Sequence, residues 1–426
     1  MTDYKVYQES APGAVESILE NNGLKLDGSV TALNAIATAL NIIASEKADI
    51  FGFDMDLSNA DPNGCISYAG ANIDYEPAFM DYTNDVFDYG DWGDAFFMPK
   101  PCMLTFGGIV EKYLNPNNYT LNADGTTSSI ASSTTANAMM EWPVIYVKRW
   151  QSGNIYHFRC SAAPFEGATC FANLNNAGET VKFYTPIYFG SLDGSNRLRS
   201  LSGGTNYVST TTDAERTAAA ANGSGWEIER MVDWLLINDL LVLMSKSRDS
   251  QTKFGRGVNG VSAAIGQGTM NDKGLFYGKS DNAFGVKVFG MENWYGNIWR
   301  RIVGWVCISG QQKVKMTYGT QDGSTAQGYN TNGNGYIDLA NATPAGTSGG
   351  YVSKNKVTPN GLIPVEASGS STTYSCDGLW FNNGANTLAL VGGAWDARAR
   401  VGASSANLSA SPGSTSAGIG AAPSYK

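Results

Sequence analysis

Several residue types are scarce in this chain, and each scarcity excludes a class of function. The 426 residues include one histidine, His157, and only 16% of them are charged. A single imidazole excludes most histidine-based metal sites and any catalysis that needs two. The net charge is −9, and arginine and lysine are scattered rather than clustered. Because phosphate binding needs concentrated positive charge, we expect no nucleic acid as a partner.

Long apolar runs and secretion signals are also missing. No apolar run approaches the roughly 18 residues of a membrane-spanning helix, so we expect no membrane insertion. The first residues, MTDYKVYQES, have neither a basic nor an apolar signal region, which predicts synthesis in a cytoplasm without secretion. The cysteines form no CxxC pair, so the simplest expectation is reduced, mostly buried thiols. They are Cys65, Cys102, Cys160, Cys170, Cys307 and Cys376.

Glycine, aromatic and apolar residues are abundant instead. There are 50 glycines, and 42% of the residues are hydrophobic and 11% aromatic. This mixture predicts many turns and little exposed helix. The length predicts two or three domains. We therefore expect a β-rich α+β protein with an N-terminal helical segment (1–50), a β-rich domain (51–145) and a C-terminal domain (146–426).

The N-terminal segment carries one amphipathic pattern over residues 27–47. Its apolar residues recur at three- and four-residue steps, at Val30, Leu33, Ile36, Leu40 and Ile43. Such a narrow stripe is typical of a short coiled-coil seam, which would serve attachment and trimerisation. A helix packed on its own domain is the alternative.

Acidic and aromatic residues alternate between Asp74 and Gly108. The pattern fits carbohydrate stacking, but it fits better a β-domain whose aromatic residues face a core and whose aspartates occupy turns. A glycosidase-like carboxylate pair between Asp74 and Asp94 remains an alternative, although nothing marks a specific pair. Residues 126–135 are rich in Ser and Thr and predict a loop.

The C-terminal domain contains predicted strands and one strong helix. Residues 144–150 and 154–160 alternate as a hairpin does, and 185–191 predict another strand. Residues 226–244 predict a helix whose second half is apolar on every face and therefore buried on all sides.

Four pieces of this domain carry a family resemblance. They are that helix with its polar continuation, GMENWYGNIWRRIVGWV (290–306), ALVGGAWDARAR (389–400) and GIGAAPSYK (418–426). In this order, residues 180–426 resemble the formylglycine-generating-enzyme branch of the C-type lectin fold, in which GN-x-W-x-W precedes RGGSW and a closing IGFR strand. The matching residues are Gly296, Asn297, Trp299, Gly392, Gly393 and Trp395. Within that branch the chain is most similar to variable proteins of diversity-generating retroelements, of the phage major tropism determinant kind.

The residues around the third piece support a displayed loop independently of the resemblance. An apolar run, Leu388–Val391, leads into two glycines that permit a sharp turn, and Trp395 can then anchor the chain. Residues 396–417 contain almost nothing that builds a core, so we expect them on the surface. Ile419 and Tyr425 can return the chain to a sheet. A polar loop held at both ends by a scaffold is a common way to present a binding surface.

The resemblance implies which positions of this 394–417 segment are diversified. Retroelement mutagenesis acts on adenines, and asparagine codons are its preferred targets. The implied variable positions are Ala394, Asp396, Ala397, Arg400, Ser404, Ser405, Asn407, Ser409, Ala410, Gly413 and Ser414. The implied fixed positions are Trp395, Gly402, Leu408, Ile419 and Gly420.

The expected ligand-binding surface contains few strong anchors. Asp396, Arg398 and Arg400 offer charge, and no aromatic residue lies between 396 and 417. Since binding hot spots favour Trp, Tyr and Arg, this copy is expected to bind weakly and to depend on multivalency. Trp380 and Phe381 could add an aromatic wall, with core packing as the alternative.

No enzymatic activity, cofactor or metal is expected. The formylglycine relatives are copper-dependent oxidases with a cysteine pair near the C-terminal strands, but neither Cys307 nor Cys376 lies in the corresponding segment. The calcium-dependent lectin triplets EPN, QPD and WND, and the GxSxG, HExxH and P-loop motifs, do not occur. Residues 330–338 resemble a calcium loop, but Asn341 replaces its final glutamate, which favours an Asn-Gly turn.

The sequence and the resemblance together predict a non-catalytic receptor-binding protein on the surface of a phage virion, as on a tail fibre or capsid. It would be synthesised in the bacterial cytoplasm. Its expected partners are a host cell-surface receptor (protein or glycan), other virion proteins and two copies of itself in a homotrimer. The alternatives are a structural head or tail decoration protein without a receptor role and, less favoured, a glycan depolymerase.

Overall fold

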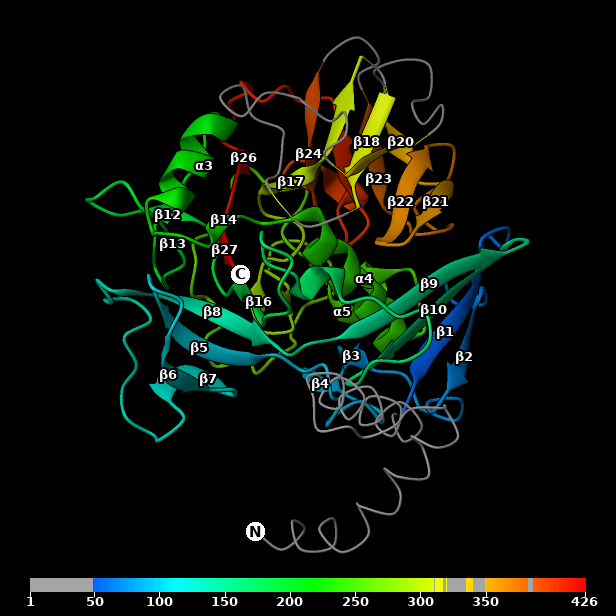
Figure 1. Cartoon of the computed structure of the whole chain (residues 1–426), viewed down its shortest axis with the longest axis horizontal. Helices are drawn as coiled ribbons and strands as arrows, with labels where there is room; N and C mark the ends of the chain where they lie inside the picture. The colour runs from blue at the N-terminus through cyan, green and yellow to red at the C-terminus, as the bar shows by residue number, and fades with distance from the viewer. Residues whose placement is uncertain (1–48, 310, 317–318, 320–334, 340–348, 382–385) are drawn as a thin grey trace, which may run out of the picture.

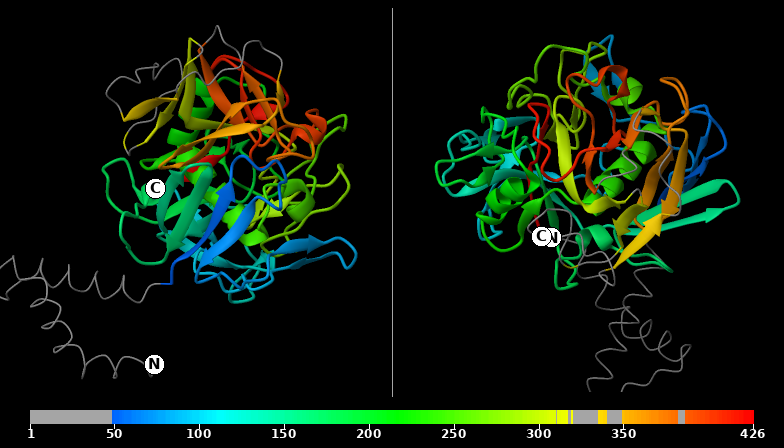
Figure 2. Two further views of the ribbon diagram at one scale, coloured as in Figure 1. Left: turned by 90° about the vertical axis from the view of Figure 1, so that its right-hand side faces the viewer. Right: turned by 90° about the horizontal axis from the view of Figure 1, so that it is seen from above.

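The computed structural model describes residues 49–309, 311–316, 319, 335–339, 349–381 and 386–426. The amphipathic pattern over 27–47, with its predicted trimer seam, lies outside these residues. The described chain is β-rich, with 37% strand and 10% helix, which confirms the predicted β-rich α+β class. Figure 1 shows α4 (Met231–Ser245) and α5 (Ser250–Phe254) in the middle, one large sheet above them and two further sheets below, and Figure 2 shows the same layers from two other sides.

A four-stranded antiparallel sheet has the order β2-β1-β10-β9. Its strands are β1 (Phe51–Asp56), β2 (Ile66–Gly70), β9 (Tyr146–Ser152) and β10 (Ile155–Ser161). The predicted hairpin is thus confirmed as β9–β10, in which Trp150 pairs with His157. Alternation along β10 buries Tyr156 and Phe158 and leaves His157 on the outer face.

A seven-stranded sheet has the order β14-β27-β11-β8-β5-β6-β7. Its strands are β5 (Lys100–Thr105), β6 (Val110–Asn115), β7 (Asn118–Asn122), β8 (Ala136–Trp142), β11 (Phe183–Pro186), β14 (Trp226–Ile228) and β27 (Pro423–Tyr425). The strand expected over 185–191 therefore begins and ends earlier, as β11. The predicted return of the chain at Tyr425 is confirmed, because Tyr425 pairs with Tyr184 and Trp226.

These two sheets do not respect the boundary expected at residue 145. β1 pairs with β10, and β8 pairs with β11, so strands from both sides of the boundary share each sheet. One buried cluster also contains residues from both segments. The acidic and aromatic stretch behaves as predicted, since Trp92 and Phe97 are fully buried and Asp81 and Asp88 accept backbone N–H groups in turns.

The third sheet has eight strands, seven of them in the order β19-β18-β17-β24-β25-β23-β20, with β26 paired to β17. The strands are β17 (Trp299–Ile308), β18 (Gln311–Lys315), β19 (Tyr336–Leu339), β20 (Gly350–Tyr351), β23 (Gly378–Phe381), β24 (Thr387–Val391), β25 (Ala406–Leu408) and β26 (Ile419–Gly420). Ile419 lies parallel to Trp299, which confirms the second predicted return to a sheet.

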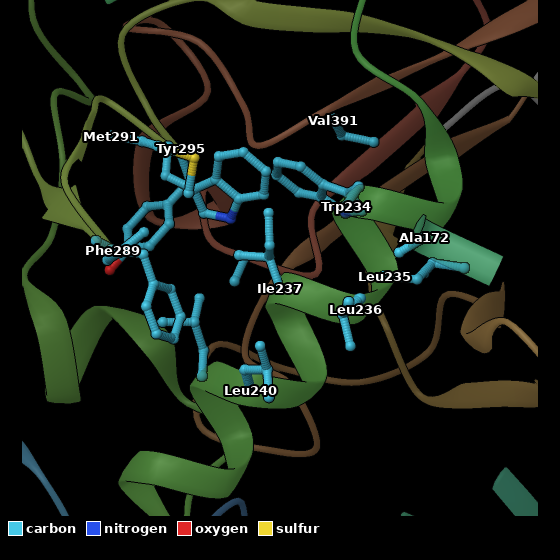
Figure 3. Packing of buried hydrophobic residues seen from close by; sticks show 14 of the residues in the cluster. Ala172, Trp234, Leu235, Leu236, Ile237, Leu240, Phe289, Met291, Tyr295 and Val391 are labelled. Atoms are coloured by element: carbon cyan, nitrogen blue, oxygen red, sulfur yellow. The ribbon is translucent and has the colours of Figure 1, made fainter. Parts of the chain in front are cut away.

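The buried helix is α4 (Met231–Ser245). It begins five residues later than predicted, because Trp226–Ile228 form β14 beside β27. Its apolar second half is buried as predicted. Trp234 stacks on Trp294 with ring centroids 4.4 Å apart. Figure 3 shows side chains of α4, among them Ile237 and Leu240, in the same buried cluster as Tyr295 and Val391. Among the described helices, none is long and apolar enough to span a membrane.

Shorter elements complete the fold. They are α3 (Thr212–Ala220), α5 (Ser250–Phe254), η1 (Phe171–Asn173), η2 (Arg398–Arg400), and the two-stranded pairs β3 (Phe79–Asp81) with β4 (Val86–Asp88), β12 (Ser191–Leu192) with β13 (Leu198–Arg199), β15 (Lys287–Val288) with β16 (Met291–Glu292), and β21 (Lys354–Thr358) with β22 (Gly361–Glu366).

Candidate ligand-binding site

The 394–417 segment is not a surface loop throughout, which corrects the expectation for 396–417. Its residues 406–408 form β25, which lies inside the eight-stranded sheet, parallel to β23 and antiparallel to β24. Val401, Ala406 and Leu408 are buried. The composition did not predict this strand, because the sequence around it has no long apolar run. Its small residues nevertheless fit between two neighbouring strands.

Strand alternation divides the residues of this sheet between two faces. In β25, Ala406 and Leu408 join the core cluster around α4, while Asn407 points to the opposite face. In β23, Phe381 joins the same core and is 2% exposed, while Trp380 on the opposite face is half-buried. Trp380 and Asn407 are directly paired neighbours. The outer face of the sheet thus collects the polar and aromatic residues of these strands.

An open hollow of about 630 Å³ lies on this outer face. Six of the predicted ligand-binding residues line it: Trp380, Asp396, Ala397, Arg398, Arg400 and Asn407. They come from β23, β25 and the turn around η2. The remaining lining residues are Trp299, Tyr351 and Ala399. This volume is within the range of small-ligand sites, roughly 300–1,000 Å³.

The Arg400 guanidinium lies between two aromatic rings of the hollow. Its central carbon is 5.5 Å from the ring centroid of Tyr351 and 5.6 Å from that of Trp380. Trp380 also meets the Trp299 ring edge to face, with centroids 5.3 Å apart at 90°. These contacts fix the orientation of the arginine and of both indoles. The hollow therefore offers apolar ring faces beside one oriented cation.

Three predicted site residues are inaccessible to a ligand. Ala394 and Ser405 are fully buried, and Phe381 is 2% exposed. Ala394 packs with Trp299 and Leu390 beneath the hollow. The Ser405 hydroxyl donates to the Arg400 carbonyl oxygen at 2.9 Å, so it supports the turn that carries the arginine. For Phe381 the core-packing alternative is the one observed.

The other predicted residues lie away from the hollow. The Ser404 N–H donates to a carboxylate oxygen of Asp377 at 2.8 Å. Burial raises the pKa of that carboxyl well above its usual range. Ser409 donates to the Asn407 side chain, and the Ser411 and Ser414 hydroxyls are 3.1 Å apart. The remaining two are the half-buried Ala410 and the exposed Gly413.

Main-chain carbonyl groups anchor the whole segment. Gln251 donates its side-chain amide to Ala399 and Val401, and Asn238 donates to Ala403. The part of the segment after β25 is held in the same way, by donors from the β24, α3 and β17 regions. The carbonyls of Ala410, Pro412, Ser414 and Ser416 accept from Leu388, Thr212, Arg301 and Ser209 respectively. Because every residue has a carbonyl group, these anchors do not depend on the side chains of the segment.

The residues of the two resemblance motifs meet directly. The Trp395 N–H donates to the Asn297 carbonyl at 3.0 Å, and the Asn297 side chain accepts from the Ile265 N–H at 2.8 Å. Gly296, Gly392 and Gly393 all have positive φ, between 73° and 87°, where a Cβ is strained. This arrangement fixes the entry of the 394–417 segment.

Two residues that line the hollow, Trp299 and Tyr351, were not predicted as site residues from the sequence. Trp299 was identified only as a residue of the GN-x-W motif, although it also lines the hollow. Tyr351 reaches the hollow only because β20 pairs with β23, a pairing that leaves no local signal. The alternation of side chains along β23 could have been used as a signal in the sequence, since it places Trp380 and Phe381 on opposite faces of the sheet.

Chemistry at other positions is limited among the described residues. They contain no cluster of three or more His, Cys, Asp and Glu side chains that could hold a metal ion. All six cysteines are free thiols. Of the calcium-like string, only the part from 335 is described, and there Asp338 lies in β19 and pairs with Lys313 at 2.5 Å. No protein-family model matches the chain, and no curated protein matches it either.

Proposed function

We propose that this chain is a receptor-binding, tropism-determining protein of a phage virion, with a retroelement-diversified binding surface on a C-type-lectin-like scaffold. The observation that carries the proposal is the anchoring of residues 395–416 through main-chain carbonyls, while exposed side chains of the same segment border an aromatic hollow. Side chains at such positions can be exchanged without removing the bonds that hold the segment. A rigid surface also keeps the entropic cost of binding low.

Binding is favoured over catalysis by the charges of the hollow. Among its lining residues only Asp396 is a carboxylate, whereas glycosidases use two. The carboxylates between Asp74 and Asp94 lie in another part of the chain, where Asp81 and Asp88 accept turn N–H groups and Asp91 accepts the N–H of Glu76. These contacts weaken the depolymerase alternative.

The proposal places the protein on the virion surface, at the tail or capsid. Its ligand would be a host cell-surface receptor, either protein or glycan. Residues 1–50 would join other virion proteins and a homotrimer. Three copies of the hollow would then act together, so that modest single-site affinities suffice. A structural decoration protein would have the same location but would need no such hollow.

The test compares two half-exposed tryptophans on different sheets. Trp380→Ala removes a wall of the hollow, and Trp150→Ala, on β9, is the matched control. We expect Trp380→Ala to lower binding to cells of the phage host at least about tenfold, as for a binding hot spot, and Trp150→Ala to leave it unchanged. Equal binding by both variants, or no binding by the unmodified protein, would favour the decoration alternative.

A further inference from the structure

A second hollow of about 630 Å³ adjoins the first. It lies between α5 and the loops around Asp61, Tyr82 and Thr372. Ala399 lines both hollows, so the turn around η2 forms a ridge between them. The two hollows are therefore neighbours that are separated by one short segment.

The ridge is held rigidly from the side of the second hollow. Gln251, which lines this hollow, donates to the carbonyls of Ala399 at 3.0 Å and Val401 at 2.7 Å. Ala399 is exposed and has only a methyl side chain, so the crest is low. A ligand can cross it without displacing a large side chain.

The lining of the second hollow is polar where the first is aromatic. It includes the hydroxyl groups of Ser280, Ser371 and Thr372 and the guanidinium of Arg256. Asp61 and Asp249 add two negative charges, and each already accepts a backbone N–H, from Asn63 and Thr252. Together with Asp396, Arg398 and Arg400 of the first hollow, the two linings contain three acidic and three basic side chains. Such a surface suits a ligand that carries many hydroxyl groups and little net charge.

We propose that the two hollows are successive subsites for one linear, uncharged carbohydrate chain that crosses the ridge at Ala399. One sugar ring would pack on Trp380 in the first hollow, because aromatic faces cover the apolar face of a ring. The following sugars would hydrogen-bond the polar groups of the second hollow. The inference rests on the proposed receptor-binding role of the first hollow and assigns it a ligand class.

Repeated small units explain the pair of hollows better than a folded protein partner does. Each hollow has the size of a small-ligand site, and a single low residue separates them. A linear glycan places similar units at regular intervals and so fills both. Occupying two linked subsites raises affinity beyond that of either one.

The experiment is a binding series on an array of linear oligosaccharides, each sugar present in lengths from about one to eight units, with calorimetry of the best binders. Affinity should rise at least about tenfold once the chain is long enough to reach the second hollow. Thr372→Trp and Ser280→Trp fill the second hollow from two exposed positions and should remove only this gain. Thr120→Trp, at an exposed position of β7, is the matched control.

The outcomes separate this inference from the proposed function. If Trp380→Ala abolishes binding but affinity does not grow with length, the second subsite is wrong and the receptor-binding role stands. If the array gives no binding while a host surface protein binds in a Trp380-dependent way, the carbohydrate class is wrong. If Trp380→Ala has no effect on any binding, both proposals fail.

Discussion

The backbone N–H of Gly296 donates to the carbonyl oxygen of Gly392 at a distance of 2.9 Å. This bond joins two motifs that are far apart in the sequence. Both residues have positive φ, so the turn on each side of the bond favours glycine. The contact sets where β24 ends and where the 394–417 segment begins. It brings two glycine-containing pieces, 290–306 and 389–400, together at the start of that segment.

Two glycines of the 394–417 segment should respond differently to alanine. Gly402 has φ near 152°, and an added Cβ would lie 1.8 Å from a carboxylate oxygen of buried Asp377. Gly402→Ala should lower the free energy of unfolding by about 3 kcal/mol. Gly413 has nothing within 4 Å of an added Cβ, so Gly413→Ala is the control and should be nearly neutral. Urea unfolding measures both, and equal stabilities would contradict the observed turn.

Stability should also depend on position within β25 and the residues after it. Leu408 is fully buried in the core, so Leu408→Ala should cost about 2–5 kcal/mol. Ser409, next along the chain, is half-buried and its hydroxyl donates to the neighbouring Asn407, so Ser409→Ala should change stability by less than about 0.5 kcal/mol. Thermal unfolding followed by circular dichroism distinguishes the two. A neutral Leu408→Ala would restore the view of this region as a free surface loop.

The buried pair between Glu215 and Arg301 predicts a pH dependence. Their side chains are fully buried and 2.6 Å apart. Burial, which outweighs the nearby guanidinium, raises the pKa of Glu215 from 4.5 to about 7. The folded state therefore binds a proton that the unfolded state has released, and this contribution to stability is full below pH 4.5 and is lost as the pH rises through about 7.

Glu215→Gln tests this dependence because it mimics the protonated carboxyl. Between pH 4.5 and about 8, the unfolding free energy of the unmodified protein should fall relative to that of the variant, by about 3 kcal/mol. The measurement is urea unfolding at a series of pH values. A constant difference between the two proteins would show that Glu215 has the same pKa in both states.

Thiol chemistry should single out one cysteine. Cys170 is half-buried and the other five are buried. Burial raises the pKa of Cys376 to about 12, which removes the reactive thiolate at neutral pH. With a coloured disulfide reagent, one thiol per folded chain should react rapidly, and Cys170→Ser should abolish this phase. Rapid reaction of several thiols in the folded state would contradict the described packing.

Local patterns predicted those parts of the structure that local interactions determine. The β9–β10 hairpin follows from alternation over adjacent residues, and the burial of α4 follows from apolar residues on all its faces. The start of α4 was missed because Trp226–Ile228 pair with β27, almost 200 residues away. For the same reason the boundary at residue 145 failed to predict the shared sheets, since strand partners leave no mark in nearby sequence.

The candidate site was predicted in part. Sequence identified the η2 turn, Trp380 and Asn407, because the resemblance indicated the segment and aromatic residues lay close to it. It did not reveal β25, whose three residues are too few for alternation to be recognised. It also missed Tyr351, which reaches the hollow through strand pairing alone. The face of the sheet to which a side chain points, rather than its residue type, decides whether the residue lines the hollow or packs in the core.

The position of β26 and β27 after the 394–417 segment has a consequence for errors in the gene. β27 lies between β14 and β11 in one sheet, and β26 pairs with β17 in another. A frameshift or premature stop within the segment alters or removes both β26 and β27, whereas a substitution at an exposed position leaves them intact. A chain with an altered reading frame would therefore lack the strands that complete these two sheets, so we expect it not to fold, whereas a chain with an exposed substitution keeps both.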